Sequence, residues 1–503
     1  MGFIFSGVDA NYKVPKYLGK IVFGAGNVSA GSVPLYVLYV GMKTSSGSMT
    51  ADQDIVEVFD EDDVDARAGA RSQLAWMARS GIKAAKTSRH FIAAVAEPTG
   101  TAATATVLIA GAWTTPGQWA FTIAGITISG SVAASDPIDT VGADMAARLT
   151  ANTRIPITAV YSSGSDTLTV TCANKGIQSK DWILAVDKSL LPTGMTLTMT
   201  GSASLTGDRV RLGASATGTG TEDVTTLLTL LQTGRYARIA AAQNDATNAA
   251  LWETHVNAKA GITTLILEQL VFGHNGTQSA ATSIAQTTLN AQRAQVIWMR
   301  NAMTHPSVVA AVKTAVRAQT EGADPVPDYD GLVLEGIPGH FIASDQPSDA
   351  EQNTALNNGV TPVTSSNGNA IVVRSITSYC LNGAAQDDRT IDIGDAVMTD
   401  YATIDSKLLY DTVFRPANKY VGADPAEGEQ EPPAGVAYPR LWNGDLLNRM
   451  QGWFANGWIE DPATNPPISQ YNSVSKRIES TMPLLVRRVQ HQLGNITRQT
   501  SNA

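Results

Sequence analysis

The apolar positions of this chain alternate between a strand pattern and a helix pattern. Residues 32–41 and 90–97 are continuous apolar runs, which are typical of buried strands. The stretch between them has apolar side chains at helical spacing, and Gly81 is expected to end that helix. The residues on its apolar face are Leu74, Met77 and Ala78. The order strand–helix–strand favours a β-α-β unit.

The same alternation returns after residue 213. A helix is expected over 222–233, and Pro306 is expected to open another, because proline is favoured at the first helical position. Strand patterns occur at 237–242, 262–271 and 294–300, and the run YDGLVLEGI (329–337) ends the series. We therefore predict an α/β (α+β) core with a mostly parallel or mixed sheet.

Residues 99–212 differ in both composition and pattern. Between Glu97 and Arg148 the only charged residues are three aspartates, at positions 136, 139 and 144. Apolar residues alternate with Thr, Ser or Ala, as on half-buried strands, in Trp119/Phe121/Ile123, Ile126/Ile128, Leu168/Val170/Cys172 and Met195/Leu197/Met199. One helix is indicated by Val141, Met145 and Leu149. We predict a β-rich domain inserted into the α/β domain.

Asn367-Gly368 stands between two runs of β-forming residues, the strongest short-range signal for a tight hairpin. In the second run, Ile371 and Val373 lie on one face and Ile376 on the other, so we expect this strand to be covered on both sides. Three further elements are expected: a strand and long helix over 387–416, an acidic, proline-rich surface loop over 423–435, and an amphipathic helix over 445–456.

Composition narrows the class of protein. The 503 residues suggest about two to four domains. The net charge is −9, and no cluster of Lys and Arg indicates nucleic-acid binding. Cys172 and Cys380 are too few for a disulfide framework or a zinc site, so we expect two free thiols. Eight acidic residues lie between positions 52 and 65, without EF-hand spacing, and a solvated helix entrance is the favoured interpretation.

Motifs for catalysis, metal binding or cofactor binding are not found. The six histidines are scattered, and neither HExxH, a phosphate-binding loop nor GxSxG occurs. The start of the chain lacks a signal-peptide pattern, and no apolar run approaches about 18 residues, so we expect a protein made in the cytoplasm without membrane insertion. An α/β enzyme stays an alternative, with Glu268 and Arg300 as its only candidates. An adhesin, suggested by the Thr/Ser/Gly-rich insertion, is a further alternative.

Both ends of the chain contain extended segments, at 9–23 and 482–493, with strand-forming residues and no evident local partner. Strand donation between subunits would pair these segments and would also cover open sheet edges. Pairing within their own chain is an equal alternative. Residues 476–503 hold five Lys or Arg and one Glu, a local excess of positive charge.

The order and spacing of these elements resemble the contractile-tail sheath protein of Mu-like myoviruses and related phage-tail-like particles. The resemblance covers about residues 10–503. The family's usual aromatic-rich start is not found in residues 1–12. The stretches that carry the resemblance are YKVPKYLGKIVFGAGNVSAGSVPLYVLYVGMKTSSGS, AGARSQLAWMARSG, LTVTCANKGIQSKDWIL, ALNNGVTPVTSSNGNAIVVRSITSY and GWIEDP.

The resemblance implies a structural protein without a catalytic site, metal or cofactor. Such subunits stack as hexameric rings around a tail tube, exchange strands through their terminal arms, and contract to drive the tube through a cell envelope. The implied partners are neighbouring sheath subunits, the tail tube, and the baseplate and tail terminator proteins. The implied location is the virion tail, with assembly in the host cytoplasm. The sheath of a headless, tailocin-type particle is the alternative.

This interpretation predicts a division of the chain and a set of assembly residues. The division is an N-terminal arm (1–30), an α/β core (31–98 and 213–340), an outer inserted domain (99–212), a C-terminal domain (341–480) and a C-terminal arm (481–503). The expected intersubunit residues are Val14, Tyr17 and Leu18 in the first arm, Leu484, Val486 and Val489 in the second, and Ile371, Val373 and Ile376 in the receiving sheet. The candidate tube-facing residues are Arg449, Trp453, Arg487 and Arg488. Ordinary core packing is the competing interpretation of Trp453.

Overall fold

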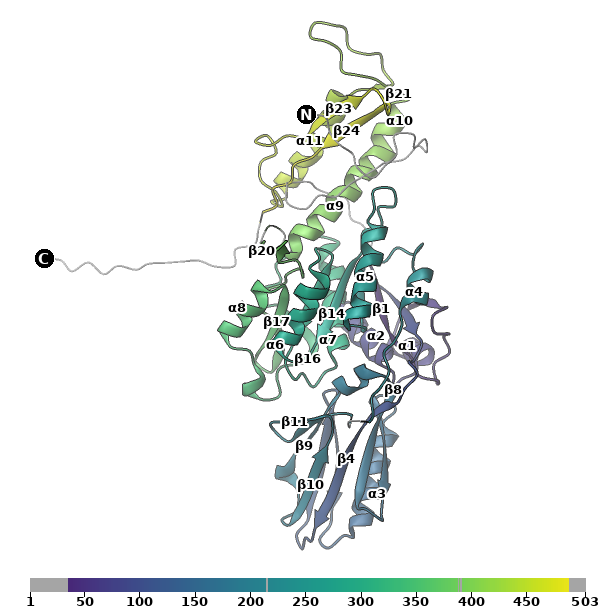
Figure 1. Ribbon diagram of the computed structural model, residues 1–503, viewed down its shortest axis with the longest axis vertical. Helices are drawn as coiled ribbons and strands as arrows, with labels where there is room; N and C mark the ends of the chain where they lie inside the picture. The colour runs from purple at the N-terminus through teal and green to yellow at the C-terminus, as the bar shows by residue number, and fades with distance from the viewer. Residues whose placement is uncertain (1–34, 214–215, 388, 390, 488–503) are drawn as a thin grey trace, which may run out of the picture. The chain divides into compact units, whose positions relative to one another are not determined.

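The computed structural model describes residues 35–213, 216–387, 389 and 391–487. Contacts within the chain separate two units (Figure 1). The first, here called the core unit, comprises residues 33–323 and 331–391, and contains the predicted insertion. The second, here called the C-terminal unit, includes residues 324–330 and 392–503. The predicted N-terminal arm and most of the C-terminal arm lie outside the described residues, and the predicted domain boundaries stay predictions.

A nine-stranded mixed sheet organises the core unit, in the order β16-β18-β17-β15-β14-β13-β1-β3-β2. The neighbouring strands β17, β15, β14, β13, β1 and β3 pair in parallel. By contrast, β2, β16 and β18 pair antiparallel with their neighbours. The predicted α/β fold class with a parallel or mixed sheet is thereby confirmed. The bounds are β1 (Tyr36–Met42), β2 (Ile55–Val58), β3 (Arg89–Val95), β13 (Arg238–Ala241), β14 (Gln269–His274), β15 (Ala294–Trp298), β16 (Val333–Pro338), β17 (Val360–Ser366) and β18 (Asn369–Val372).

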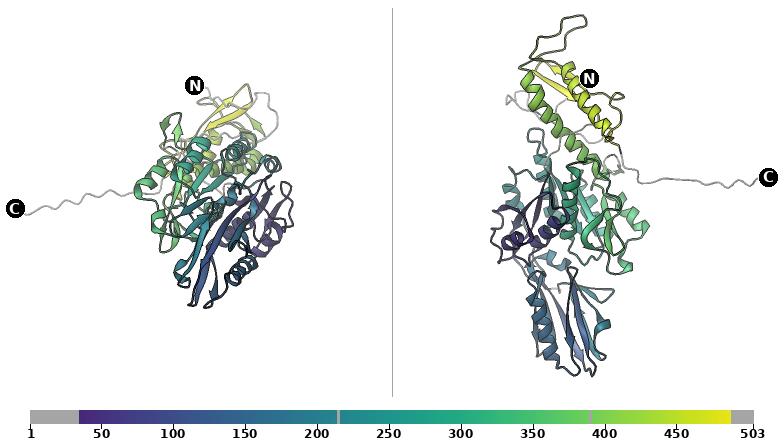
Figure 2. Two further views of the ribbon diagram at one scale, coloured as in Figure 1. Left: turned by 60° about the horizontal axis from the view of Figure 1, so that its bottom comes forward. Right: turned by 180° about the vertical axis from the view of Figure 1, so that it is seen from behind.

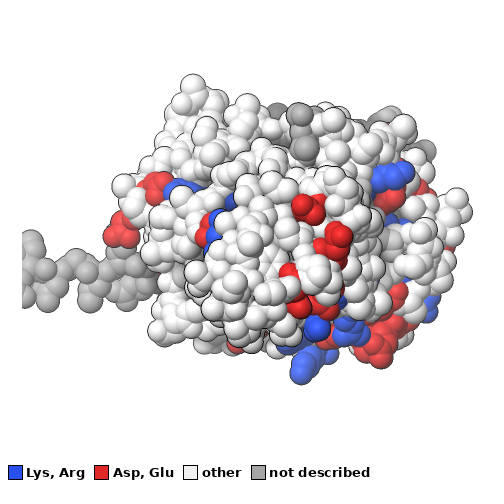
Figure 3. All heavy atoms as spheres, turned by 90° about the horizontal axis from the view of Figure 1, so that it is seen from below, with Lys and Arg blue, Asp and Glu red and all other residues white. Residues whose placement is uncertain are grey.

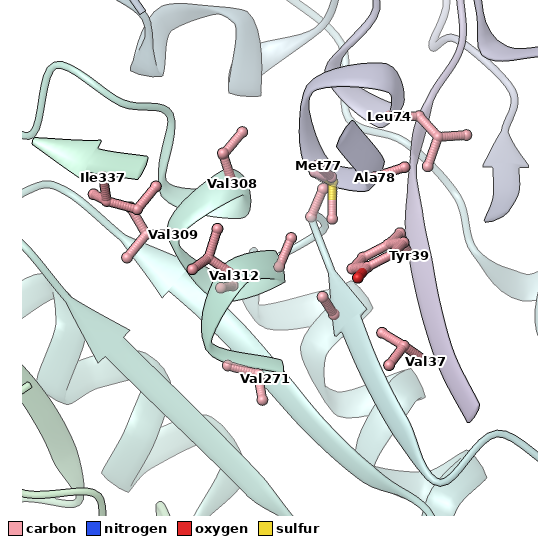
Figure 4. Close-up of a cluster of buried hydrophobic side chains, with 14 of the residues drawn as sticks. Val37, Tyr39, Leu74, Met77, Ala78, Val271, Val308, Val309, Val312 and Ile337 are labelled. Atoms are coloured by element: carbon pink, nitrogen blue, oxygen red, sulfur yellow. The ribbon is translucent and has the colours of Figure 1, made fainter. Parts of the chain in front are cut away.

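Helices cover both faces of this sheet because its parallel strands are apolar on both sides. In β1, Val37 and Tyr39 pack in a cluster with α2 and α7, whereas Leu38 and Val40 pack in another with α4 and α5. Figure 4 shows the first cluster, with Met77 of α2 near Tyr39 and the valines of α7 in the same layer. The helices are α1 (Glu61–Ala68), α2 (Gln73–Ala84), α4 (Thr225–Leu230), α5 (Ala246–Lys259), α6 (Gln278–Thr282), α7 (Pro306–Glu321) and α8 (Asp349–Asn357).

The predicted helix stop at Gly81 is wrong, because Gly81 lies inside α2. Its role is close packing. A Cβ atom at Gly81 would lie 2.0 Å from Tyr39 Oη, and the Tyr39 ring is fully buried. Tyr39 Oη lies 2.9 Å from His90 Nδ1, which fixes the ring on the side of β3. The glycine therefore lets helix and sheet approach each other.

Gly81→Ala is expected to destabilise the core unit by about 1–3 kcal/mol, the usual cost of overpacking a filled core. The added methyl group must displace the Tyr39 ring and its contact with His90. The urea midpoint of unfolding measures the effect. Gly164→Ala is the matched control, because no atom lies within 4 Å of a Cβ placed there. Equal midpoints for the two variants would contradict the packing role.

In its described residues the insertion consists of two antiparallel sheets, one α-helix, α3 (Ile138–Ala151), and two short 3-10 helices. The strand orders are β10-β4-β8-β7 and β11-β12-β9-β5-β6. The four predicted alternating patterns lie on β5, β6, β8 and β10, so those strand predictions are confirmed. The bounds are β4 (Ala102–Gly111), β5 (Gly117–Ile123), β6 (Ile126–Val132), β7 (Ile157–Ser162), β8 (Thr167–Lys175), β9 (Ile183–Val186), β10 (Met195–Thr200), β11 (Ala203–Leu205) and β12 (Arg209–Arg211).

The predicted hairpin is confirmed as the pair β17–β18. Asn367 and Gly368 have φ angles of 51° and 78°, which a type I′ turn requires at both central positions. The second strand is shorter than predicted, because the ladder with β17 ends at Val372.

The C-terminal unit is built on two helices, α9 (Ile393–Leu409) and α11 (Pro439–Ala455). Helix α11 begins at Pro439, earlier than predicted, with the proline in its first turn. The hairpin β23 (Ile468–Asn472) and β24 (Arg477–Thr481) lies beside α11 (Figures 1 and 2). The predicted loop 423–435 connects the short strands β21 (Tyr420–Val421) and β22 (Val436–Ala437). A π-helical turn (Tyr410–Phe414) and α10 (Arg415–Ala417) follow α9. None of the described helices is both long enough and apolar enough to cross a membrane.

Candidate assembly surfaces

The carboxyl edge of the parallel sheet is filled by the insertion. Arg209, on β12, is fully buried and donates a 2.5 Å hydrogen bond to Asp345 Oδ2. Arg211, on the same strand, donates to Asn275 Oδ1 at 2.8 Å and to Asn301 Oδ1 at 3.1 Å. Asn275 follows β14 and Asn301 follows β15, so both lie at the carboxyl ends of their strands. Figure 1 shows the insertion sheets beyond one end of the nine-stranded sheet.

A second group of contacts extends this junction along the 3-10 helix η1 (Ile177–Asp181). His305, at the start of α7, has its Nε2 atom 3.0 Å from the carbonyl oxygen of Gln178. The Trp182 ring lies 4.7 Å from the imidazole, centre to centre. Burial lowers the pKa of His305 to about 4, so the imidazole is neutral near pH 7. In open α/β sheets the carboxyl edge is where ligands bind, and in this chain the insertion occupies it.

The two residues of the enzyme alternative lie at opposite edges of the sheet. Glu268 precedes β14, whereas Arg300 follows β15, and these two strands are parallel. Glu268 is buried and accepts hydrogen bonds from Lys259 Nζ at 2.6 Å and from the Tyr236 amide at 3.0 Å. Arg300 forms an ion pair with Glu351. Glu268 and Arg300 therefore do not form one site. Among the described residues, no group of three His, Cys, Asp or Glu side chains could hold a metal ion.

The predicted receiving residues lie in and after β18, whose two sides are both paired. Ile371 is opposite Thr364 of β17 on one side and Val333 of β16 on the other. Within the described part of the chain, the edge strand at this end of the sheet is therefore β16. Its ladder with β18 shifts register, as bulged edge strands do. The receiving role of this region stays a prediction.

The other two receiving residues continue beyond the ladder. The Val373 amide donates to the carbonyl oxygen of Pro362 at 3.0 Å. Ile376 is fully buried, and its carbonyl oxygen accepts from Gln295 Nε2 at 3.2 Å and from Thr361 Oγ1 at 3.3 Å. Side chains of β15 and β17 thus satisfy the backbone here.

The described part of the C-terminal arm pairs with its own chain. Val486 and Ile459 form an antiparallel bridge, flanked by hydrogen bonds from the Glu460 amide to Leu485 O and from the Arg487 amide to Trp458 O, both 3.0 Å. The bridge is isolated, so it does not belong to a longer ladder among the described residues. The remaining predicted arm residues lie outside the described residues: Val14, Tyr17, Leu18 and Val489.

Side chains of this segment alternate as on a strand. Leu484 and Val486 pack against the apolar cluster of the C-terminal unit, whereas Leu485 is 55% exposed. That cluster, here called the helix-pair core, comprises Met398, Tyr401, Ala402, Met450, Trp453 and Ile459. The segment is therefore anchored on one side, and its intersubunit role stays a prediction.

The candidate tube-facing residues differ in exposure. Trp453 is only 1% exposed and lies in the helix-pair core, in agreement with the core-packing interpretation. Arg449 Nε lies 3.4 Å from Asp405 Oδ2. Arg487 Nε lies 3.4 Å from Glu460 Oε1. Both arginine side chains keep more than a third of their surface exposed. Arg488 lies outside the described residues, and contact of any of these residues with a tube stays a prediction.

Charged side chains are sparse on the face shown in Figure 3, and the basic ones there do not form a continuous surface. That face therefore offers no extended basic path of the kind that tracks nucleic-acid phosphates.

Sequence reasoning missed the residues at the carboxyl edge. Arg209 and Arg211 alternate on one strand, so both side chains lie on the same face of it. This alternation was the available signal, since arginines on the inner face of a strand need acidic or amide partners. Their partners, Asp345, Asn275 and Asn301, are too distant in sequence to be inferred from spacing.

The chain matches no known protein-family model. No curated protein matches it in sequence. Its structure is similar to the sheath tail protein of Desulfitobacterium hafniense, with 12% identity and a TM-score of 0.48 over 96% of this chain and 98% of that one. It is similar to the sheath tail protein of Listeria innocua, with 12% identity and a TM-score of 0.48 over 92% and 93%.

Proposed function

We propose that this chain is a structural tail sheath subunit. It polymerises as stacked hexameric rings around a tail tube and contracts to drive the tube through the target cell envelope. Its partners are neighbouring copies, the tube protein, and the baseplate and terminator proteins. It works in the tail of a virion after assembly in the host cytoplasm, and has no catalytic site or cofactor.

The observation that carries this proposal is the ordered resemblance of the sequence over about residues 10–503. Two features of the structure support it. The carboxyl edge, where an α/β enzyme would bind its ligand, holds two arginines of the insertion, the buried Arg209 and the partly buried Arg211. The start of the C-terminal arm forms an isolated strand pair, which a further strand can extend. Head-to-tail contacts that do not close then generate a helical polymer.

The experiment compares the full chain with a version that ends at Arg487, by negative-stain electron microscopy and analytical ultracentrifugation. This cut keeps Leu484 and Val486, which pack on the helix-pair core, so the folded unit is preserved. We expect tubes or rings from the full chain and discrete small particles from the shortened one. Circular dichroism checks that both versions are folded.

A full chain that stays monomeric over a wide range of salt and protein concentration would contradict self-assembly. A shortened chain that polymerises as the full chain does would remove the C-terminal arm from the assembly mechanism. The sheath of a headless particle gives the same result in this assay and differs only in the particle that carries it.

A further inference from the structure

Glu222 is a carboxyl group buried where the insertion joins the rest of the core unit. It is 3% exposed, and neither of its carboxyl oxygens has a hydrogen-bond partner on any other described residue; its own backbone amide lies close to the carboxyl group. An ionised carboxylate that is buried without donors is strongly disfavoured. The position therefore favours the neutral acid, although most glutamates are charged near neutral pH.

The backbone closes over this group. The chain enters the insertion through residues 96–101 and returns through residues 217–224, and these two crossings run together. The Thr219 amide donates to the carbonyl oxygen of Thr101 at 3.1 Å, and the Ile177 amide donates to that of Gly220 at 2.9 Å. Gly176 lies directly against the side chain, because a Cβ there would be 2.9 Å from Glu222 Oε1 and 3.0 Å from Pro98 Cγ.

The charges that face Glu222 add to the effect of burial. Burial is the largest cause and raises the pKa of Glu222 to about 7; the backbone amide of Glu222 itself acts in the opposite direction, and the charges of Asp245 and Asp181 raise the pKa again. Asp245 caps α5, and Asp181 ends η1 with its Oδ1 atom 3.4 Å from Arg211 Nη1. Further charged residues near the junction include Asp52, Glu97, Lys180 and Asp223. None of them forms an ion pair with Glu222.

We propose that Glu222 is a proton-operated latch at the junction of the insertion. As a neutral acid it holds the return crossing, residues 217–224, closed against Gly176 and Pro98. When it ionises, the carboxylate moves into water, and the hydrogen bonds Thr219–Thr101 and Ile177–Gly220 break. The insertion stays attached through Arg209 and its partner at the carboxyl edge. Opening therefore loosens the junction without detaching the insertion.

The direction in which pH changes the opening follows from the pKa of Glu222 in the closed and open states. In the closed state the pKa of Glu222 is about 7, and in the open, hydrated state it returns to its ordinary value of 4.5. The open state therefore binds fewer protons between these values, so opening increases as the pH rises and levels off above pH 7. Between pH 5 and pH 8 the open population is expected to rise roughly 70-fold.

Hydrogen–deuterium exchange of the full chain tests the latch. Exchange of the Ile177 and Thr219 amides is measured at pH 5 and pH 8, corrected for intrinsic rates, and referred to the amides of β1. We expect protection at the junction to fall by roughly 70-fold in the wild type. Glu222→Gln should reduce this pH effect at least tenfold. Asp223→Asn, an exposed neighbour, should leave it unchanged.

A pH effect in Glu222→Gln that is reduced less than tenfold overturns the proposal, because Asp181 or another group would then be responsible. If Glu222→Gln does not fold, the proposal is tested by the pH dependence of hydrogen–deuterium exchange in the wild type. A fall in protection with a midpoint near pH 7 supports the latch, and unchanged protection between pH 5 and pH 8 overturns it.

Discussion

Glu321→Ala is expected to lower the free energy of unfolding of the core unit by about 3–5 kcal/mol, the cost of breaking a buried ion pair from one side. Glu321 ends α7 and is fully buried between two guanidinium groups. Arg317, one turn earlier, donates to it at 2.6 Å, and Arg238 of β13 forms a second ion pair with it. The substitution leaves two buried arginines without their carboxylate.

The measurement is the urea-induced unfolding transition, at a protein concentration that gives a single species in size-exclusion chromatography. Asp144→Ala is the control, because it breaks an exposed i,i+4 pair with Arg148 and should cost only about 0.3–0.5 kcal/mol. If Glu321→Ala lowers the free energy of unfolding no more than the control does, the ion pairs of Glu321 contribute nothing net to stability.

Acid should have a related effect at this site. Burial alone would raise the pKa of Glu321, but the charges of Arg238 and Arg317 outweigh it, and the pKa is lowered from its ordinary value of 4.5. A carboxyl group with a lowered pKa in the folded state stabilises above the unfolded value. This contribution is therefore complete above about pH 5 and is lost as the pH falls through the folded pKa.

Trp453→Ala is expected to destabilise the C-terminal unit by about 3–5 kcal/mol, because it removes a large buried side chain and leaves a cavity. Trp453 lies in the helix-pair core with residues of α9 and with Ile459, which itself pairs with Val486. Loss of the indole should therefore also loosen the start of the C-terminal arm. Differential scanning calorimetry measures the unfolding of this unit.

Phe454→Ala is the adjacent control on the same helix. Phe454 is 37% exposed, and its ring lies under the Arg487 guanidinium at 5.3 Å, so its loss should cost no more than about 1 kcal/mol. A Trp453→Ala variant that melts like Phe454→Ala but no longer polymerises would contradict the packing role. It would instead support contact between Trp453 and a partner.

The elements that could be predicted are those whose pattern is set by local chemistry. The apolar runs of β1 and β3 and the turn at Asn367-Gly368 needed no knowledge of distant contacts. Strand β4 was missed because its buried positions include Ala103 and Ala105, which differ little in hydrophobicity from the threonines between them. Gly81 was misread because close packing and helix termination favour the same residue.

The candidate sites were less predictable because they depend on contacts between distant segments. If the sequence had indicated that α11 begins at Pro439, Trp442 would have joined Leu446, Met450 and Trp453 in one apolar stripe. That helical spacing favours burial of the Trp453 indole. The positions of Glu268 and Arg300 at opposite edges follow only from strand direction and bounds. The pairing of β16 with β18, which covers the hairpin's outer edge, joins segments that no local motif connects.

The filled carboxyl edge bears on how this chain can be shortened or extended. A variant that replaced the insertion with a short linker would keep every strand of the large sheet, yet Asn275, Asn301 and Asp345 would lose the guanidinium groups that satisfy them. The insertion therefore supplies the hydrogen-bond donors that satisfy these polar groups at the edge of the sheet. A foreign peptide therefore belongs at the far turn around Gly164, between β7 and β8, where the surroundings are open and no junction contact is disturbed.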